Sequence, residues 1–269
     1  MLIVLSPAKR LNYSEPPVTV EPTRPRFDKD VAELARVTRK LSRADLRRLM
    51  GISDKLADLN HGRFQAFSPE EDEGALPAAF AFAGDVYEGL KARELDAESL
   101  MWAQDRLRIL SGLYGLLRPL DAIQPYRLEM GTRLRTARGA TLYDFWGDRI
   151  AAQLNADAQD HADPTLVNLA SQEYFGAVDA RALKLPVVTP QFRELRDGES
   201  RIISFFAKQA RGRMARWAVD NRVERVEDLK AFDLDGYGFD KAASSDGEWI
   251  FIRSGKTSSS PVATAVRSR

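Results

Sequence analysis

Residues 110–131 read LSGLYGLLRPLDAIQPYRLEMG, and the rest of the chain is arranged around this segment. Three glycines and two prolines interrupt its leucines. Glycine permits backbone conformations and close approaches that a Cβ atom would block, whereas proline fixes φ and prevents a helix from continuing. The segment therefore predicts a rigid, shaped loop rather than a plain core element.

The two arginines of this loop allow two interpretations. Arg118 and Arg127 each lie beside a proline-restricted backbone, which pre-organises the guanidinium to bind a carboxylate or phosphate through two hydrogen bonds. Alternatively, they pair with Asp121 and Glu129 and act as structural struts. We expect at least one arginine to line a ligand cleft. Arg127 is the better candidate because the stiff Pro125-Tyr126 turn can direct it outward.

The composition is that of an ordinary globular protein. Of 269 residues, 44% are hydrophobic and 29% charged, and 40 Lys and Arg face 39 Asp and Glu. The absence of cysteine excludes disulfides, thiolate catalysis and Fe–S clusters, and two histidines, His61 and His161, exclude a His-rich metal centre. We expect no metal and no cofactor. With no signal segment and no run approaching about 18 apolar residues, we expect a cytoplasmic protein that does not enter a membrane.

The predicted fold is a mixed α/β domain with a central sheet and surrounding helices. Leu2–Leu5 is an apolar run stopped by Ser6-Pro7, which predicts a strand buried on both faces. Lys9 follows its carboxyl end, where open α/β sheets bind ligands, so Lys9 is a candidate anion contact. Three carboxylates in comparable loops are candidate acids or bases: Asp85, Glu129 and Glu173.

Hydrophobic periodicity and turn signals predict the other elements. Further strands are expected at 107–111, 165–170, 185–192, 201–206 and 249–253. Helices are expected at 28–40, 43–50, 53–67, 97–106, 141–158, 207–217 and 226–232. Residues 70–73 are predicted to be a solvated acidic loop, 236–240 a turn, and 254–269 a disordered tail.

Two basic segments are candidate nucleic-acid surfaces. From Thr23 to Met50 there are nine Lys or Arg and four acidic residues, a net charge of +5. The helices at 43–50 and 53–67 flank an apolar-Gly-apolar hairpin that resembles a helix-hairpin-helix element, in which the hairpin amides point at a phosphate. The residues in question are Arg47, Arg48, Gly51, Ile52 and Ser53. A helical hairpin is also a common way to pack two helices, so a purely structural role is the alternative.

The second basic segment runs from Arg201 to Trp217 and contains no acidic residue. Four of its cations follow one another along a predicted helix: Lys208, Arg211, Arg213 and Arg216. Because nothing in the segment neutralises them, they could form one wall of an anion-binding cleft.

The chain also resembles the YaaA family of peroxide-stress proteins. The motifs that carry the resemblance are 5–9, 84–87, 110–131, 142–148, 168–171, 204–208 and the Gly-Glu at 247–248. The resemblance covers residues 1–253, although Arg10 stands where the family pattern has Thr. It implies a single mixed α/β domain with a positively charged cleft and a helix-hairpin-helix element. It also implies DNA binding and protection against hydrogen peroxide by lowering free iron and oxidative DNA damage.

Two functional hypotheses follow. The first is a DNA-binding protein of the peroxide-stress response, largely independent of sequence, binding duplex or single-stranded DNA. The alternative is an enzyme acting on a nucleotide-like or phosphorylated substrate, with Lys9, Arg118, Arg127 and Lys208 as anion clamps. Without cysteine or clustered histidine, direct peroxide reduction or iron storage would have to use carboxylates alone, so the first hypothesis is favoured. The oligomeric state does not follow from the sequence.

Overall fold

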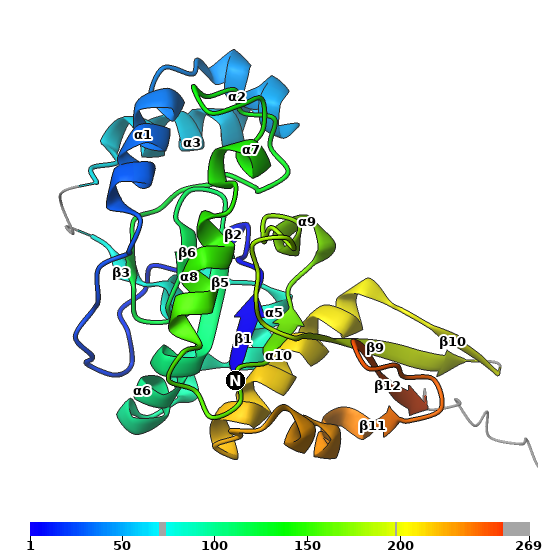
Figure 1. The fold of residues 1–269 in the computed structure, drawn as a ribbon. Coiled ribbons are helices and arrows are strands. Elements are labelled where there is room, and N and C mark those ends of the chain that lie inside the picture. The colour runs from blue at the N-terminus through cyan, green and yellow to red at the C-terminus, as the bar shows by residue number, and fades with distance from the viewer. Residues whose placement is uncertain (70–73, 197, 255–269) are drawn as a thin grey trace, which may run out of the picture.

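The computed structural model describes residues 1–69, 74–196 and 198–254, and a central sheet organises them (Figure 1). In these residues the strand order of the sheet is β11-β12-β9-β8-β1-β5-β6, with β10 paired to β9. The strands are β1 Leu2–Leu5, β5 Leu107–Ser111, β6 Gly115–Leu117, β8 Leu166–Leu169, β9 Val187–Arg196, β10 Glu199–Arg201, β11 Tyr237–Asp240 and β12 Glu248–Ser254.

The parallel part of the sheet has a defined switch point. Strands β5, β1, β8, β9 and β12 are parallel neighbours, so in chain order they stand 2-1-3-4-5. The chain first adds a strand on one side of β1 and then moves to the other side. In sheets of this type, ligands bind beyond the carboxyl ends of the strands on either side of that reversal. Here those strands are β1 and β8.

All four residues of β1 are buried, which confirms the predicted central strand. The helix α10 (Ser204–Asp220) packs against β1, β8 and β9, and against α5 (Asp85–Leu90). The α5–α10 contact is close because Gly89 and Gly212 face the partner helix; a Cβ atom on Gly212 would lie 1.8 Å from the carbonyl oxygen of Val86.

Three helices form a lobe beyond the sheet: α1 (Asp28–Thr38), α2 (Arg43–Met50) and α3 (Asp54–Ala66) (Figure 1). Ser42 caps α2 in a capping box with Asp45, and Ser53 caps α3 through its hydroxyl. Between them Gly51 has φ 61°, a left-handed conformation that suits glycine. Two short helices joined by a tight turn at Gly51 are therefore present where the sequence predicts them.

The remaining elements are short or connect the others. The helices are α4 Ala78–Ala81, α6 Ala97–Arg106, α7 Leu142–Trp146, α8 Arg149–Asp157, α9 Gln172–Phe175, η1 Ala92–Glu94, η2 Val226–Ala231 and η3 Leu234–Gly236. Two small pairs complete the strands: β2 Arg10–Leu11 with β4 Phe82–Ala83, and β3 Leu76–Pro77 with β7 Ala122–Ile123.

Four predicted elements are wrong. The helix expected at 141–158 is two helices, because Gly147 adopts φ 51° and ends α7. Of residues 201–206 only Arg201 lies in a strand, the end of β10, since α10 begins at Ser204; Ile202 and Phe205 are exposed, and burial starts at Ala207. The turn expected at 236–240 contains β11, which hydrogen bonds to β12. Residue 254 belongs to β12 rather than to a tail. The predictions for 70–73 and 255–269 lie outside the described residues.

Candidate functional site

Two serines join the strands at the switch point. Ser6 follows β1 and Ser171 follows β8. The hydroxyl oxygen of Ser6 accepts a hydrogen bond from the backbone N–H of Ser171 at 2.8 Å, and the two hydroxyl oxygens are 3.3 Å apart. The carboxyl ends of β1 and β8 are thus held together by polar groups where a ligand would bind in this kind of sheet.

Lys9, Arg127 and Glu129 meet beyond the carboxyl ends of β1 and β8, which we call the edge site. One carboxylate oxygen of Glu129, Oε1, lies 3.2 Å from Lys9 Nζ and 3.0 Å from Arg127 Nη2. The Lys9 side chain is 67% exposed, whereas those of Arg127 and Glu129 are 16% and 13% exposed. The other oxygen, Glu129 Oε2, is buried and has no hydrogen-bond donor among the described residues. The structure therefore brings together three of the predicted residues, and leaves one carboxylate oxygen unsatisfied.

Three buried tyrosines lie near one another here, and one of them, Tyr174, is close to Glu129. Tyr126 shares a 2.6 Å hydrogen bond with the hydroxyl of Ser111, and Tyr87 donates to the carbonyl oxygen of Ser6 at 3.1 Å. Burial raises the pKa of Tyr87, Tyr126 and Tyr174, and nearby tyrosine and glutamate side chains raise the pKa of Tyr174 further. The three phenols therefore stay neutral at physiological pH and can act as hydrogen-bond donors. Neither Tyr87 nor Tyr126 is among the predicted site residues.

The other two candidate carboxylates lie at the margins of this edge. Glu173 Oε1 accepts a hydrogen bond from the backbone N–H of Gly131 at 2.9 Å, so it helps to fix the end of the central loop. Asp85 begins α5, and its Oδ2 lies 3.9 Å from Lys208 Nζ. Neither carboxylate has an environment that singles it out as an acid or base.

Arg118 is held elsewhere. Its Nε and Nη2 donate to Asp121 Oδ1 at 3.0 and 2.8 Å, and its backbone N–H donates to Oδ2 at 2.7 Å. The side chain of Asp121 is completely buried. Arg118 therefore has the geometry of a strut, while Arg127 is the arginine of the loop that lies beside Lys9.

The helical hairpin is engaged in internal contacts. Arg47 pairs with Asp54 at 3.0 Å and Arg48 with Asp45 at 2.6 Å. The backbone N–H groups of Gly51 and Ile52 both donate to the carbonyl oxygen of Arg47, and the Ser53 hydroxyl caps α3. These amides are used inside the hairpin, so phosphate binding by this element stays a prediction.

The basic segment 201–217 is mostly neutralised, contrary to expectation. Glu199 and Asp220 flank the segment in the sequence, whereas Asp85 and Asp235 come from other parts of the fold, which the local sequence cannot show. The pairs are Arg201 with Glu199, Lys208 with Asp85, Arg213 with Asp235, and Arg216 with Asp220. Arg211 has no acidic partner among the described residues, and burial lowers its pKa.

A basic groove that the predicted site residues do not include lies along α1. We call it the α1 groove; it is an open hollow of about 620 Å³ lined by Glu33, Arg36, Val37, Arg39, Lys40 and Ala137. Arg36 and Lys40 are exposed and lack acidic partners in the described part of the chain, because Arg138 binds the nearby Asp30 and Glu33. Their i, i+4 spacing on one helix face was the available sequence signal.

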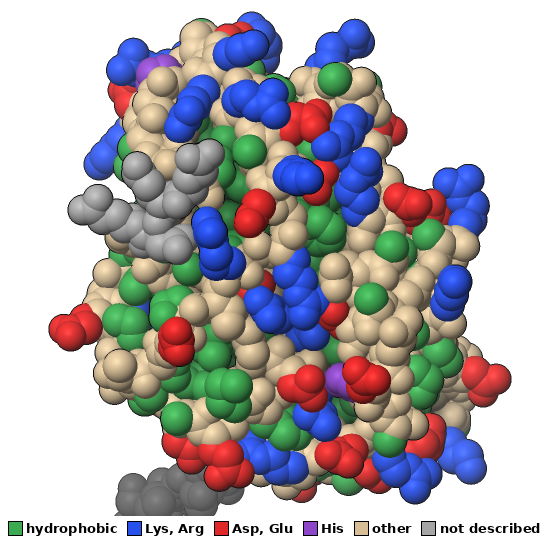
Figure 2. Space-filling view, turned by 60° about the vertical axis from the view of Figure 1, so that its left-hand side comes forward, with side chains coloured by type: hydrophobic (Ala, Val, Ile, Leu, Met, Phe, Trp, Pro, Cys, Tyr) green, Lys and Arg blue, Asp and Glu red, His purple; other side chains and the backbone are tan. Residues whose placement is uncertain are grey.

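Two more exposed arginines, Arg133 and Arg135, belong to the segment that contributes Ala137 to the α1 groove. They too have no acidic partner within residues 1–69, 74–196 and 198–254. Figure 2 shows Lys and Arg side chains gathered over the upper part of the molecule, where Figure 1 places α1 to α3. The exposed charge of the helical lobe is therefore predominantly positive.

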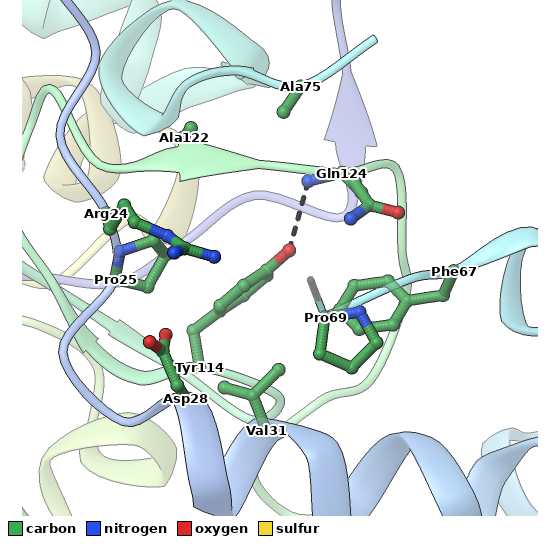
Figure 3. A pocket seen from close by; sticks show the side chains of 10 residues that line it. All are labelled: Arg24, Pro25, Asp28, Val31, Phe67, Pro69, Ala75, Tyr114, Ala122 and Gln124. Atoms are coloured by element: carbon green, nitrogen blue, oxygen red, sulfur yellow. Dashed lines mark hydrogen bonds between the residues drawn. The ribbon is translucent and has the colours of Figure 1, made fainter. Parts of the chain in front are cut away.

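A separate cavity beside α1 is too small for a ligand (Figure 3). It has room for about 20 Å³, roughly one water molecule. The phenol of Tyr114 lies across it, and its hydroxyl accepts a hydrogen bond from the backbone N–H of Gln124 at 3.0 Å.

The described residues contain no group of three or more metal-binding side chains. They also contain no helix long and apolar enough to cross a membrane.

Comparison with known proteins places the chain in a family. The family model of peroxide stress protein YaaA matches residues 1–243. A UPF0246 protein of Caulobacter vibrioides is 63% identical over 253 residues, covering 94% of this chain and 99% of that protein. A UPF0246 protein of Cereibacter sphaeroides is 57% identical over 259 residues, covering 95% of this chain and 100% of that protein. The chain therefore belongs to the YaaA family of peroxide stress proteins.

Proposed function

We propose that this protein acts in the peroxide-stress response by binding DNA through the α1 groove, with little dependence on base sequence. The observations that support the proposal are Arg36 and Lys40 in the α1 groove and the exposed Arg133 and Arg135 in the segment that contributes Ala137 to it, four cations without an acidic partner among the described residues. Exposed cations without acidic partners are free to contact phosphates, which supply most of the affinity in sequence-independent DNA binding. Arg47 and Arg48 of the hairpin, by contrast, would have to break their ion pairs with Asp54 and Asp45 before they could contact a phosphate.

DNA binding of this kind offers a physical route to protection from peroxide. Ferrous ions associate with DNA phosphates as counterions, and there each one reduces hydrogen peroxide to hydroxide and a hydroxyl radical while becoming ferric. A protein that neutralises phosphates releases condensed counterions from the duplex. Bound protein would therefore lower the amount of iron that can generate radicals next to a base, without a metal site of its own.

The test is fluorescence anisotropy of a labelled duplex at a fixed low salt concentration. Arg36→Ala combined with Lys40→Ala is expected to weaken binding by about tenfold or more, because two phosphate contacts are lost. The matched control is Arg47→Ala with Arg48→Ala on the neighbouring helix, where Asp54 and Asp45 already engage the cations. The control should lose less affinity.

Two results would count against the proposal. A wild-type protein that does not bind the duplex would remove DNA binding altogether. An equal loss of DNA affinity in the two double variants would show that the hairpin contributes as much as the α1 groove, which would then not be the principal DNA-binding surface.

A further inference from the structure

The Lys9–Arg127–Glu129 group differs from an ordinary structural ion pair. In the Arg118–Asp121 strut both carboxylate oxygens accept hydrogen bonds, Oδ1 from the guanidinium and Oδ2 from the backbone N–H of Arg118. Here Lys9 Nζ and Arg127 Nη2 both approach the same oxygen, Glu129 Oε1, at 3.2 and 3.0 Å. Glu129 Oε2 is buried and receives no hydrogen bond from residues 1–69, 74–196 or 198–254. The arrangement leaves one acceptor unused and makes two cations share a single oxygen.

The group also carries an excess of positive charge. Arg63 lies near enough that Arg127 helps to lower its pKa, after the larger effect of burial. Among the described residues its Nη1 donates one long hydrogen bond of 3.4 Å, to the side-chain oxygen of Asn60. Lys9 and Arg127 thus share the carboxylate of Glu129, and Arg63 adds a third positive charge near Arg127. An additional anion would be attracted to this edge.

The position in the fold fits a ligand site. Lys9 follows β1, whose end is joined to that of β8 by the Ser6–Ser171 contact at the switch point. Tyr174 lies near Glu129 and Tyr126, and the Lys9 side chain is two-thirds exposed. Open α/β sheets commonly bind phosphorylated ligands at this place in the fold.

We propose that this edge binds a phosphorylated small molecule of the nucleotide class. The phosphate takes the place of Glu129 Oε1 on Lys9 and Arg127. The released carboxylate of Glu129 turns to accept an N–H or O–H donor of the same ligand, which satisfies the oxygen that is unpaired in the free protein. The site is separate from the α1 groove and does not depend on DNA binding.

Isothermal titration calorimetry with adenosine 5′-monophosphate and with inorganic phosphate tests this proposal. We expect wild-type protein to bind the nucleotide more tightly than phosphate, and Lys9→Ala to weaken both by about tenfold. The matched control is Arg10→Ala, because Arg10 is 68% exposed and its one acidic partner in the described part of the chain is the exposed Glu88, at 3.0 Å. This neighbouring variant should bind as the wild type does.

Glu129→Gln separates a ligand-site role from a structural one. Removing the carboxylate charge frees Lys9 and Arg127, so inorganic phosphate should bind more tightly, while the preference for the nucleotide over phosphate should shrink. A purely structural carboxylate would give only a lower melting temperature. If Glu129→Gln does not fold, the comparison of Lys9→Ala with Arg10→Ala decides the matter alone, since both positions are exposed.

The proposal is overturned if neither compound gives a binding heat at millimolar concentration, or if Lys9→Ala and Arg10→Ala bind equally well. The Arg36→Ala, Lys40→Ala double variant should keep nucleotide binding. Nucleotide binding retained in this variant would show that the edge site and the α1 groove bind their ligands independently.

Discussion

At the scale of single residues, Arg118 supports a buried charge. The carboxylate of Asp121 is fully buried and also accepts from the Thr23 hydroxyl at 2.6 Å. Arg118→Ala leaves this charge with fewer donors, so the free energy of unfolding should fall by about 3 kcal/mol, the low end of the range for broken buried pairs. Urea denaturation measures the change. Arg181→Ala is the control, because Arg181 is 92% exposed and pairs with its neighbour Asp179. Equal stability of the two variants would contradict the strut role.

His161 should make stability depend on pH. Its ring is 7% exposed and its Nδ1 lies 2.9 Å from the carbonyl oxygen of Met1. Burial lowers its pKa below the ordinary value of 6.5, and the nearby N-terminal ammonium lowers it further. The unfolded chain therefore takes up the proton first as the pH falls. The stability contributed by neutral His161 is present above pH 6.5 and is lost as the pH falls from there towards the folded-state pKa.

We expect His161→Gln to flatten the decline in unfolding free energy between about pH 7 and about pH 5, because this replacement removes the titrating group. Carboxyl groups with a lowered pKa, such as Asp163, act only below their ordinary value of 3.8 and fall outside this window. Identical pH profiles for the variant and the wild type would show that His161 titrates alike in both states.

Local residue pairs could be predicted, but distant ones could not. The Arg118–Asp121 and Arg127–Glu129 pairs lie within one loop, and the sequence offered them as one of two alternatives. The contact of Lys9 with Glu129 depends on how the sheet brings residues 9 and 129 together. Arg36 and Lys40 in the α1 groove have no acidic partner among the described residues, because Arg138, from a distant segment, binds the nearby Asp30 and Glu33.

At the scale of elements, the α5–α10 crossing depends on glycine. A Cβ atom at Gly212 would lie 1.8 Å from the Val86 carbonyl oxygen, so Gly212→Ala should force the helices apart. We expect a loss of about 1–3 kcal/mol or more in chemical denaturation. Gly62→Ala on α3 is the control, because no neighbouring atom of the described residues lies within 4 Å of the added Cβ atom. Alanine favours a helix over glycine, so this variant should raise the free energy of unfolding by about 0.5–1 kcal/mol. A stable Gly212→Ala variant would refute the close crossing.

Element boundaries were predictable where a cap defines them. Ser42 and Ser53 begin α2 and α3 through side-chain hydrogen bonds, and both starts match the predicted positions within a residue. Prediction failed at Gly147, where the periodic apolar pattern continues although the left-handed conformation of Gly147 ends α7. It failed again at residues 201–206, whose β-branched and aromatic side chains suggest a strand although the chain turns into α10. Tertiary packing overrides local preference there.

At the scale of the whole molecule, the sequence predicted a mixed α/β fold and family membership, and both are confirmed. It could not predict the strand order, because parallel pairing such as β1 with β8 joins segments more than 160 residues apart. The switch point and the edge site follow from that order. The charge of the helical lobe was visible in the sequence as a local net +5, but only the fold shows which cations are unpaired.

The salt dependence of duplex binding tests the central claim most directly. If Arg36, Lys40, Arg133 and Arg135 each contact a phosphate, a plot of log affinity against log salt concentration should have a slope near −4, from about 0.9 per contact. The Arg36→Ala, Lys40→Ala variant should reduce the magnitude of that slope by about 2. A wild-type slope near zero, or a slope unchanged in the variant, would contradict DNA binding through the α1 groove.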